Sequence, residues 1–560
     1  MTRRQAILSL SAAAAAASAA NAAPGTPPEA PAKVVERTDA AVDTYLRSQI
    51  TEPGRWLGSV ADEYMQHPVG VASGVIELMT AALIHPASKH HGENELVNRI
   101  RLAAGYMERS QSPEGFIDLL STNFNSPPDT GFVVHNVGTA AAVAKLYGND
   151  TVLGIIRPFL VKAGNGLAVG GIHTPNHRWV VSSALAQIND VFPNPAYMKR
   201  IDQWLAEGID IDADGQYTER STVTYNTICD RAFTVLAAKL KRPELLDPVR
   251  RNLRAMMYLL HPDGEVVTEV SKRQDQFVRG TMSGYWFPVQ YMAVHDSDGQ
   301  FSTLARQLGP ENARLSALME YPELNSALPP AAALPDNYEK SFPLVGLARI
   351  RRGDLDATVI LQDNSRFFTA RKGPLVVNAV RFATSFFGKG QFIPTATVQK
   401  DGAYVATQSL DAPYYQPLVP VQKVTPQNWS DLRIKRHKTQ ICKLEQSATV
   451  KEKAGGFDVR IQATGNTSGT PLGVPLAIEI SLREGGQLEG CRPAPHVDGG
   501  WVLEKQFATY KLEGKTLRFG PGDPSHLLTQ LRGAEAKLPG ISVYVTGYTP
   551  FDRTISFEFL

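Results

Sequence analysis

The sequence is poor in cysteine, in long apolar runs and in charge of one sign. Its 560 residues include three cysteines, 57 basic residues and 55 acidic residues, which give a formal net charge of +2. Three thiols do not make a disulfide framework, although Cys442 and Cys491 could either pair or stay free. Beyond the first residues no apolar run is long enough to span a membrane, and no basic run or basic helix face is present. We therefore expect a mature chain without a membrane span and without a nucleic-acid partner.

Two common catalytic motifs are also missing. The sequence has no glycine-rich phosphate loop and no G-x-S-x-G turn around a nucleophilic serine. Both absences argue against a nucleotide cofactor and against serine-hydrolase chemistry.

The N-terminus is typical of a targeting segment. Adjacent arginines at Arg3 and Arg4 precede a weakly apolar, alanine-rich stretch, and small residues suited to a signal peptidase follow it. We interpret residues 1–22 as a twin-arginine-like signal peptide, with an ordinary secretory signal as the alternative. The sequence thus predicts an exported bacterial protein, either periplasmic or secreted.

The rest of the chain divides into a helical part and a β-rich part. After a Pro-rich linker at 23–39, residues 40–326 show apolar residues at helical spacing. A second linker at 327–340 contains the sequence LPPAAALPD, and residues 341–560 contain short β-branched and aromatic segments separated by turn residues. The clearest helical segments are 75–84, 137–146, 179–188 and 232–240, and the clearest strands are 357–361, 367–371, 375–382, 457–463, 477–482, 541–548 and 554–560. The β-rich part is typical of an antiparallel β-sandwich.

A repeat is visible within the helical part. The Asp214-Gly215 turn is echoed 49 residues later by Asp263-Gly264, and a weaker copy at 113–118 lies about 100 residues before the first. A period near 50 residues fits one helical hairpin per repeat. Hairpins that close into a ring would form an α/α toroid with a cleft where the loops converge.

The polar cluster at 173–179, HTPNHRW, lies between two apolar stretches, where such side chains are costly to bury without partners. It contains the pair Asn176-His177, and about 40 residues later follows a D-G-x-Y-x-E-x-S-x-x-x-Y motif that ends at Tyr225. This pattern resembles that of heparinase II/III-like and alginate-lyase type polysaccharide lyases. The resemblance implies an N-terminal α/α toroid, a C-terminal β-sandwich and an acidic, uronate-containing polysaccharide as the substrate.

The resemblance also implies a reaction, β-elimination. A base removes the proton at C5, next to the sugar carboxylate, and the glycosidic oxygen at C4 then leaves. The enzyme must neutralise the carboxylate and stabilise the charge that develops on it. By this resemblance Asn176 would bind the carboxylate, His177 would help to neutralise it or act as the base, and Tyr225 would be the general acid, and also the base where both act on one face. The sequence leaves open the polymer, the choice between endo and exo attack, and the choice between syn and anti elimination.

Further residues are candidates for substrate binding, and each also has a structural alternative as a cap, a core residue or a solvated charge. They are the charged residues Arg178, Glu219, Arg220 and Arg273, the polar residues His135, Asn136 and His173, and the aromatic residues Tyr217 and Trp179 as sugar platforms. For Glu219 and Arg220 a structural pair at the turn is favoured over a binding role, which stays open.

Two other functions stay open at this stage. A glycoside hydrolase on the same scaffold would need two carboxyl groups, drawn from Asp118, Asp129, Asp214, Glu219 and Asp263. A periplasmic glycan-binding protein would keep the arginines and aromatics without catalysis. Some relatives hold zinc in the sandwich, but the histidines of the β-rich part lack close metal-ligand spacing. We therefore predict no cofactor, with a structural zinc or calcium ion left open, and either a monomer or a homodimer.

Overall fold

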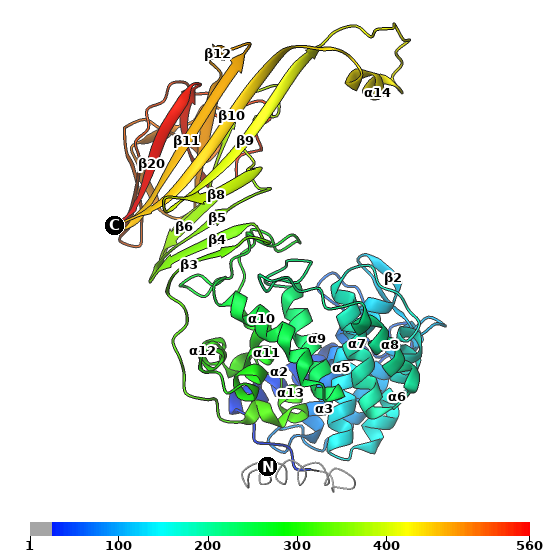
Figure 1. Cartoon of the computed structure of the whole chain (residues 1–560). Coiled ribbons are helices and arrows are strands. Elements are labelled where there is room, and N and C mark those ends of the chain that lie inside the picture. Colours follow the sequence, from blue (N-terminus) through cyan, green and yellow to red (C-terminus); the bar gives the residue numbers. More distant parts are fainter. Residues whose placement is uncertain (1–24) are drawn as a thin grey trace, which may run out of the picture. The chain divides into compact units, whose positions relative to one another are not determined.

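A computed structural model describes residues 25–560, and its contacts divide the chain into two units. The helical unit runs up to Met257 and includes Ser271–Leu334, whereas the second unit comprises Tyr258–Val270 and Pro335–Leu560. Figure 1 shows that helices dominate the first unit and strands the second. The predicted signal peptide, 1–22, lies outside the described residues.

The helical unit is built from alternating inner and outer helices. Its elements are α2 (Ala32–Ser48), α3 (Val69–Ile84), α4 (Asn94–Ser110), β1 (Ile117–Leu119), β2 (Asn123–Ser126), α5 (Pro127–Leu146), α6 (Asp150–Leu167), α7 (Asn176–Val191), α8 (Pro195–Ala206), α9 (Tyr225–Leu240), α10 (Asp247–Met256), α11 (Trp286–His295), α12 (Gly299–Leu308) and α13 (Leu315–Glu320). The four helices predicted from the sequence are confirmed as parts of α3, α5, α7 and α9. Each of them begins several residues before its predicted segment; in α7 and α9 the added first turn includes polar residues such as Asn176 and Asn226.

The inner helices are buried on nearly every side. Twelve of the sixteen residues of α3 are buried, against five of the seventeen residues of α2, which is amphipathic and covers the outside. Helices α3, α5, α7 and α9 pack side by side in chain order, and α13 returns to pack against α3 and α5. This arrangement is an α/α toroid, as the repeat predicted.

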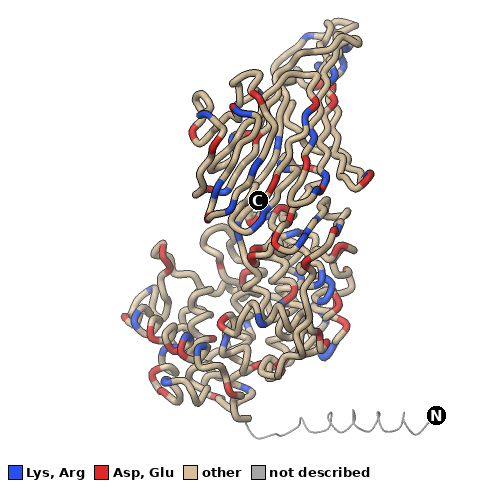
Figure 2. Tube along the Cα trace, turned by 90° about the vertical axis from the view of Figure 1, so that its left-hand side faces the viewer, with Lys and Arg blue, Asp and Glu red and all other residues tan. Residues whose placement is uncertain are grey.

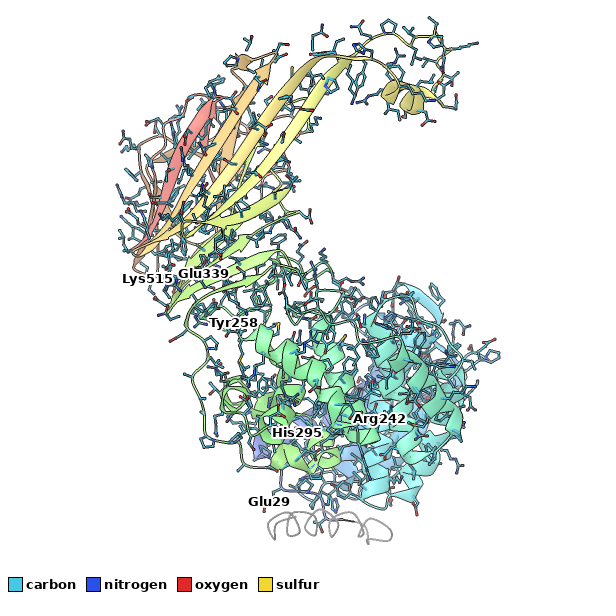
Figure 3. All side chains as sticks on the ribbon, viewed as in Figure 1. Glu29, Arg242, Tyr258, His295, Glu339 and Lys515 are labelled. Carbon is cyan, nitrogen blue, oxygen red and sulfur yellow. The ribbon has the colours of Figure 1, made fainter. Side chains whose placement is uncertain are left out.

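Hydrogen bonds between buried polar side chains fix the inner helices in the same direction. Asn136 of α5 donates to the Ser73 hydroxyl of α3 (2.9 Å), and His135 Nε2 lies 2.8 Å from the Ser183 hydroxyl of α7. One turn further along both helices, Gln187 donates to Thr139 (3.2 Å). Since residue numbers rise together along α5 and α7, the two helices are parallel and their N-termini lie at one end of the toroid. Figure 3 labels Arg242, which lies just after the C-terminus of α9, and His295, the last residue of α11; these C-terminal ends lie away from the helix N-termini.

The turn repeat seen in the sequence is a repeat of backbone geometry. In the Asp212 turn, the Gly215 N–H donates to the Asp212 carbonyl (3.1 Å) and the Asp212 N–H to the Gln216 carbonyl (2.9 Å). The same two hydrogen bonds close the turns that start at Ser112 and His261. A fourth copy starts at Asp62, where Met65 has the positive φ (59°) that glycine has in the other three. The sequence could not reveal this copy, because a methionine rarely adopts that conformation.

The second unit is a β-sandwich of two sheets. One sheet has the order β14-β17-β18-β20-β11-β10-β9-β8, with β12 beside β11, and the other has the order β15-β16-β19-β13-β7-β6-β5-β4-β3. The strands are β3 (Asn337–Phe342), β4 (Leu347–Arg352), β5 (Leu355–Ile360), β6 (Phe368–Lys372), β7 (Leu375–Thr384), β8 (Ala396–Lys400), β9 (Ala403–Tyr415), β10 (Lys438–Lys453), β11 (Gly456–Thr467), β12 (Thr470–Leu472), β13 (Pro475–Leu482), β14 (Gln487–Glu489), β15 (Cys491–Pro493), β16 (Gly500–Leu503), β17 (Ala508–Leu512), β18 (Lys515–Gly520), β19 (Ile541–Tyr548) and β20 (Phe551–Phe559); helix α14 spans Trp429–Ile434. Among these pairs only β16 and β19 are parallel, and one apolar core joins both sheets.

The segment Tyr258–Val270 belongs to the second unit although it lies within the range predicted for the toroid. The reason is a buried ionic cluster: the Asp356 carboxylate of β5 accepts hydrogen bonds from His261 (2.7 Å) and from Arg349. Burial alone would raise the pKa of Asp356, but the charges of Arg349 and His261 lower it below its ordinary value. Removing one member of such a cluster would leave the others buried without an ionic partner, which is costly. The cluster therefore holds the segment firmly to the sheet.

Three further observations bear on the sequence predictions. Helix α2 begins at Ala32, inside the predicted linker at 23–39, because Val34, Val35 and Val42 bury an apolar face. Cys229, Cys442 and Cys491 are all free thiols. Basic and acidic residues are interspersed along both units (Figure 2), as the small net charge implies.

Searches for membrane and metal features gave no candidates in residues 25–560. No helix there combines the length and the apolar character that a bilayer span requires. Likewise, no group of three or more His, Cys, Asp or Glu side chains in this range is arranged to hold a metal ion.

Substitutions at two glycines of the helical unit distinguish the cost of backbone strain from the cost of a steric clash. Gly115 and Gly208 both have positive φ, but a Cβ on Gly115 would lie 2.3 Å from the Lys162 carbonyl oxygen, whereas one on Gly208 meets no described atom within 4 Å. Gly208→Ala should lower the free energy of unfolding by about 1 kcal/mol, the cost of the left-handed conformation. Gly115→Ala should lower it by about 2–4 kcal/mol, since overpacking adds to that strain. Urea unfolding followed by helical circular dichroism measures both, and equal losses would contradict the proposed role of the close approach.

Candidate active site

The first turn of α7 carries the Asn176-His177 pair. The Asn176 side chain is 2% exposed, and its Nδ2 donates to Glu219 Oε2 (2.5 Å) and to the Thr174 hydroxyl (3.2 Å). Its buried Oδ1 accepts no hydrogen bond from any described residue. The resemblance implies that the Asn176 amide N–H binds a substrate carboxylate, but in this structure it donates to Glu219. The atom of Asn176 that remains open is the acceptor Oδ1.

His177 is held as a neutral imidazole. Burial lowers its pKa to about 4, the neighbouring His173 and Arg273 act in the same direction, and Asp129 of α5 opposes them. His173 is exposed and lies edge-on to His177, with ring centroids 4.6 Å apart. The His177 Nδ1 is buried and has no partner among the described residues. A neutral ring with an open nitrogen is suited to accepting a proton rather than to neutralising a carboxylate.

Tyr225 is the first residue of α9 and is half-buried. Its hydroxyl oxygen accepts a hydrogen bond from Gln274 Nε2 (3.1 Å), and the Arg273 guanidinium lies 5.0 Å from the centre of its ring. Arg273 also lies 3.8 Å from Glu219. One cation thus links Tyr225 to the Asn176–Glu219 pair, and it favours negative charge wherever that develops between them.

A buried carboxylate joins the two loops that carry these groups. Asp275 accepts hydrogen bonds from the Ser221 hydroxyl (3.0 Å), the Val223 N–H (3.1 Å) and the Ser271 hydroxyl (3.1 Å). Ser221 in turn accepts from the Tyr225 N–H (3.0 Å). Arg273 and Gln274 immediately precede Asp275 in the same loop. Asp275 therefore positions Tyr225 in relation to both of them.

Glu219 is a buried carboxyl at the centre of the cluster. Burial raises its pKa above the ordinary value, and the hydrogen bond from Asn176 and the charge of Arg273 only partly oppose this effect. The neighbouring Arg220 has a positive φ (47°), and its carbonyl accepts a hydrogen bond from the Lys272 N–H (2.7 Å), which ties the two loops together a second time. Arg220 thus contributes through its backbone to the shape of the site.

Three predicted binding residues lie behind the site rather than in it. Trp179 is fully buried and donates to Asp210 (2.8 Å), and Tyr217 is 2% exposed and donates to Asp230 (2.9 Å). Arg178 lies over the Trp179 ring (4.5 Å) and pairs with Asp210 (2.8 Å). The two aromatic rings have no face open to a sugar, so they differ from the platforms predicted, and Arg178 is already neutralised.

His135 and Asn136 lie in the middle of α5, not at a helix start. They make the links to α7 and α3 described above, and Asn136 also accepts from Arg314 (3.2 Å). Burial, with a smaller effect of Arg231, lowers the pKa of His135 to about 3. Both residues are part of the interface between inner helices.

The candidate carboxylates for a hydrolase are dispersed. Asp129 accepts from Asn123 (2.9 Å) and Ser126 (2.5 Å) and acts electrostatically on His177, whereas Glu219 is bonded to Asn176. Asp263 belongs to the second unit, where it pairs with Arg371 (3.4 Å). Asp118 lines a separate pocket, described below.

A cavity of about 360 Å³ lies in the interior of the toroid. Its wall includes Thr227 and Ile228 of α9, within one helical turn of Tyr225, together with Arg231 and Arg314. The residues that line this cavity do not include Tyr225 itself, so the cavity begins further along α9 than the cluster.

Sequence reasoning missed two residues of the site, Gln274 and Asp275. Both lie in the segment that follows the second Asp-Gly turn, about one repeat after Tyr225. In that segment only Arg273 was predicted to bind the substrate. Their roles depend on contacts with residues about 50 positions earlier, which a local pattern does not reveal.

Comparisons with known proteins give a match in structure only. No protein-family model matches the chain, and no curated protein matches its sequence. Among solved structures, the chondroitin AC lyase of Streptomyces coelicolor in complex with chondroitin sulphate has a TM-score of 0.55 at 14% identity, covering 96% of this chain and 80% of that one. A xanthan lyase of Paenibacillus has a TM-score of 0.55 at 11% identity, covering 94% and 56%. The heparan sulfate lyase HepC of Pedobacter heparinus has a TM-score of 0.51 at 11% identity, covering 96% and 84%.

These likenesses define the fold. The chain has the architecture of polysaccharide lyases in which an α/α toroid precedes antiparallel β-sheets. At identities of 11–14% they show the fold alone.

The charge state of His177 can be tested directly. In the folded protein the His177 ring should titrate near pH 4. NMR of labelled histidine follows this titration, and the loss of one signal in His177→Gln assigns it. Arg273→Gln removes a cation and should raise this pKa, whereas Asp129→Asn removes an anion and should lower it. Because the unfolded chain binds the proton with a pKa of about 6.5, His177 should weaken the fold as the pH falls from about 6.5 towards 4, and not above. Shifts of the same sign in both variants would refute the electrostatic assignment.

Proposed function

We propose that this protein is a polysaccharide lyase that cleaves a uronate-containing glycan by β-elimination. The observation that carries the proposal is the cluster at the N-termini of α7 and α9, where a neutral His177, a Tyr225 hydroxyl and the Arg273 guanidinium come together. The proposal draws support from the fold shared with three lyases whose names specify chondroitin, xanthan and heparan sulfate, all acidic glycans.

Each group then has a chemical role. Arg273 neutralises the sugar carboxylate, because the Asn176 donor is directed at Glu219. Neutralising this carboxylate makes the C5 proton more acidic, and either the neutral His177 imidazole or Tyr225 in its phenolate form removes it. In the second case the proton that Tyr225 takes from C5 is the one that it later gives up. Tyr225 then donates its proton to the C4 oxygen as that oxygen leaves. The raised pKa of Glu219 reduces the repulsion that a second carboxylate would cause at this position.

Asn176 is a positioning residue in this scheme. Its amide holds Glu219 and the Thr174 hydroxyl, so it orients the cluster from the first turn of α7. Its open Oδ1 is an acceptor suited to a sugar hydroxyl.

A glycoside hydrolase is a second candidate because of one observation, the raised pKa of Glu219. A protonated carboxyl is the general acid that glycoside hydrolysis requires, and Asp129, near His177, would supply the second carboxylate. The two reactions leave different products, so one assay separates them.

The elimination itself is the test. The mature protein should generate ultraviolet absorbance with one polymer from a panel of alginate, hyaluronan, chondroitin sulfate, heparan sulfate and xanthan, because elimination leaves a conjugated double bond and hydrolysis does not. Tyr225→Phe should lower the rate about 10²–10⁴-fold, the usual contribution of general acid–base catalysis. Tyr45→Phe on the outer helix α2 is the matched control and should keep the wild-type rate.

New reducing ends without absorbance would replace the lyase with the hydrolase. Binding of a polymer without any cleavage, unchanged in Tyr225→Phe, would favour a glycan-binding protein.

A further inference from the structure

A second pocket, of about 400 Å³, lies in the helical unit apart from the Tyr225 cluster. Its wall includes Arg55, Trp56, His67, Tyr106, Arg109 and Asp118. These residues come from the loop before α3, the C-terminal turn of α4 and strand β1. We call it the distal pocket.

The distal pocket is at the same end of the toroid as the candidate active site. His67 lies two residues before the start of α3, and Asn176 starts α7. Helix α5 packs between these two and is parallel to α7. The start of α5 lies beside the pocket, because Asp118 of β1 lines it and the neighbouring Ile117 N–H donates to Thr130 in the first turn of α5 (2.9 Å). Two steps between neighbouring helices span about 20 Å. A ligand that reaches both places is therefore a chain of sugars rather than a single sugar.

The pocket presents arginines that are held in place. The Arg55 guanidinium lies 4.5 Å from the centre of the Trp56 ring, and that ring stacks on His67 with centroids 4.3 Å apart and an interplanar angle of 11°. His67 is fixed in turn, by a hydrogen bond between its Nδ1 and the Ser59 hydroxyl (2.9 Å) and by the Tyr106 hydroxyl, which donates to its carbonyl (2.5 Å). A guanidinium held over an aromatic ring loses less freedom when it binds an anion than an unsupported one does.

The second arginine is positioned from the other side. Arg109 donates one N–H to the Leu57 carbonyl (2.5 Å), and a guanidinium has further donors for a ligand. Both arginines act on the Tyr106 hydroxyl electrostatically, which places both charges at the same wall. Asp118 is the one acidic residue among those that line the pocket, and its Oδ1 accepts from the Asn125 N–H (2.6 Å). The lining therefore carries a net positive charge.

The loops that border the pocket expose aromatic side chains. Tyr64, in the turn that starts at Asp62, is 76% exposed, and Phe124 of β2 is 69% exposed. Exposed rings beside fixed cations are suited to sugars, which offer apolar ring faces as well as charged groups.

We propose that the distal pocket binds an anionic group, a carboxylate or a sulfate ester, on a sugar of the substrate remote from the bond that is cleaved. This inference rests on the proposed function, because it takes the ligand to be the same acidic glycan. Its consequence is that affinity depends on chain length: Arg55 and Arg109 bind only substrates long enough to reach them from Tyr225.

The experiment compares Arg55→Ala/Arg109→Ala with Arg101→Ala, an exposed arginine of α4 that does not line the pocket. For the polymer that is cleaved, the double variant should raise KM about tenfold or more, the effect of losing charge-assisted hydrogen bonds. Its kcat should stay within about twofold of wild type, and its KM for the shortest cleaved oligosaccharide should not change. Arg101→Ala should match wild type throughout. Equal KM values for the polymer in the double variant and wild type would overturn the proposal.

A binding assay keeps the test independent of catalysis. Affinity electrophoresis in gels that contain hyaluronan (carboxylate only), carrageenan (sulfate only) or chondroitin sulfate (both) should retard wild type more than the double variant, and the gels that do so identify the anion. Retardation that depends on the arginines without any cleavage would reject the lyase and keep the pocket. Cleavage with retardation that the arginines do not affect, or no retardation in any gel, would reject the pocket. Arg55→Ala alone, at an exposed position, should show part of the effect, so that a folding defect of the double variant is recognised.

Discussion

The parallel direction of the inner helices is the constraint on which the rest of the helical unit depends. More than half of the residues of α3, α5, α7 and α9 are buried, and the chain returns along an outer helix before the next inner helix begins. Every inner helix therefore starts at the same end of the toroid. The polar residues of the first turns and of the preceding loops therefore gather at that end, where they can bond to one another across neighbouring helices. The candidate active site and the distal pocket are both products of this arrangement.

Within that frame, Asp275 determines how precisely the reactive groups are placed. Its carboxylate takes one donor from its own loop and two from the loop that leads to Tyr225, over a separation of about 50 residues. A buried carboxylate with three donors is costly to disturb. The distance between the Tyr225 hydroxyl and the Arg273 charge is thus fixed by a group that touches neither the substrate nor the reacting atoms.

The sequence predicted the fold class well, because burial leaves a periodic pattern. The apolar spacing located α3, α5, α7 and α9, and the β-branched and aromatic segments between turn residues located β5, β6, β7, β11, β13, β19 and β20. Asn176, His177 and Tyr225 were picked out by a motif, and the structure brings them to neighbouring helix ends.

The remainder depended on contacts between distant residues. The direction of the Asn176 amide is set by Glu219, 43 positions later, and the burial of Trp179 and Tyr217 by packing against Phe233. The turn at Asp62 was hidden because Met65 occupies a glycine conformation. In each case the local sequence is compatible with more than one environment, and only the tertiary structure selects among them.

The assignment of Tyr258–Val270 to the β-rich unit has a consequence for how the protein could have been assembled in evolution. The polypeptide passes from one unit to the other three times, after Met257, Val270 and Leu334. A gene for the helical unit alone, ended at any one point, would either lose the helices that follow Ser271 or retain a segment whose His261 lacks its Asp356 partner. The two units could not have been joined in their present form by simple end-to-end fusion of independent genes. The boundary between the two units therefore does not coincide with any single point of the chain.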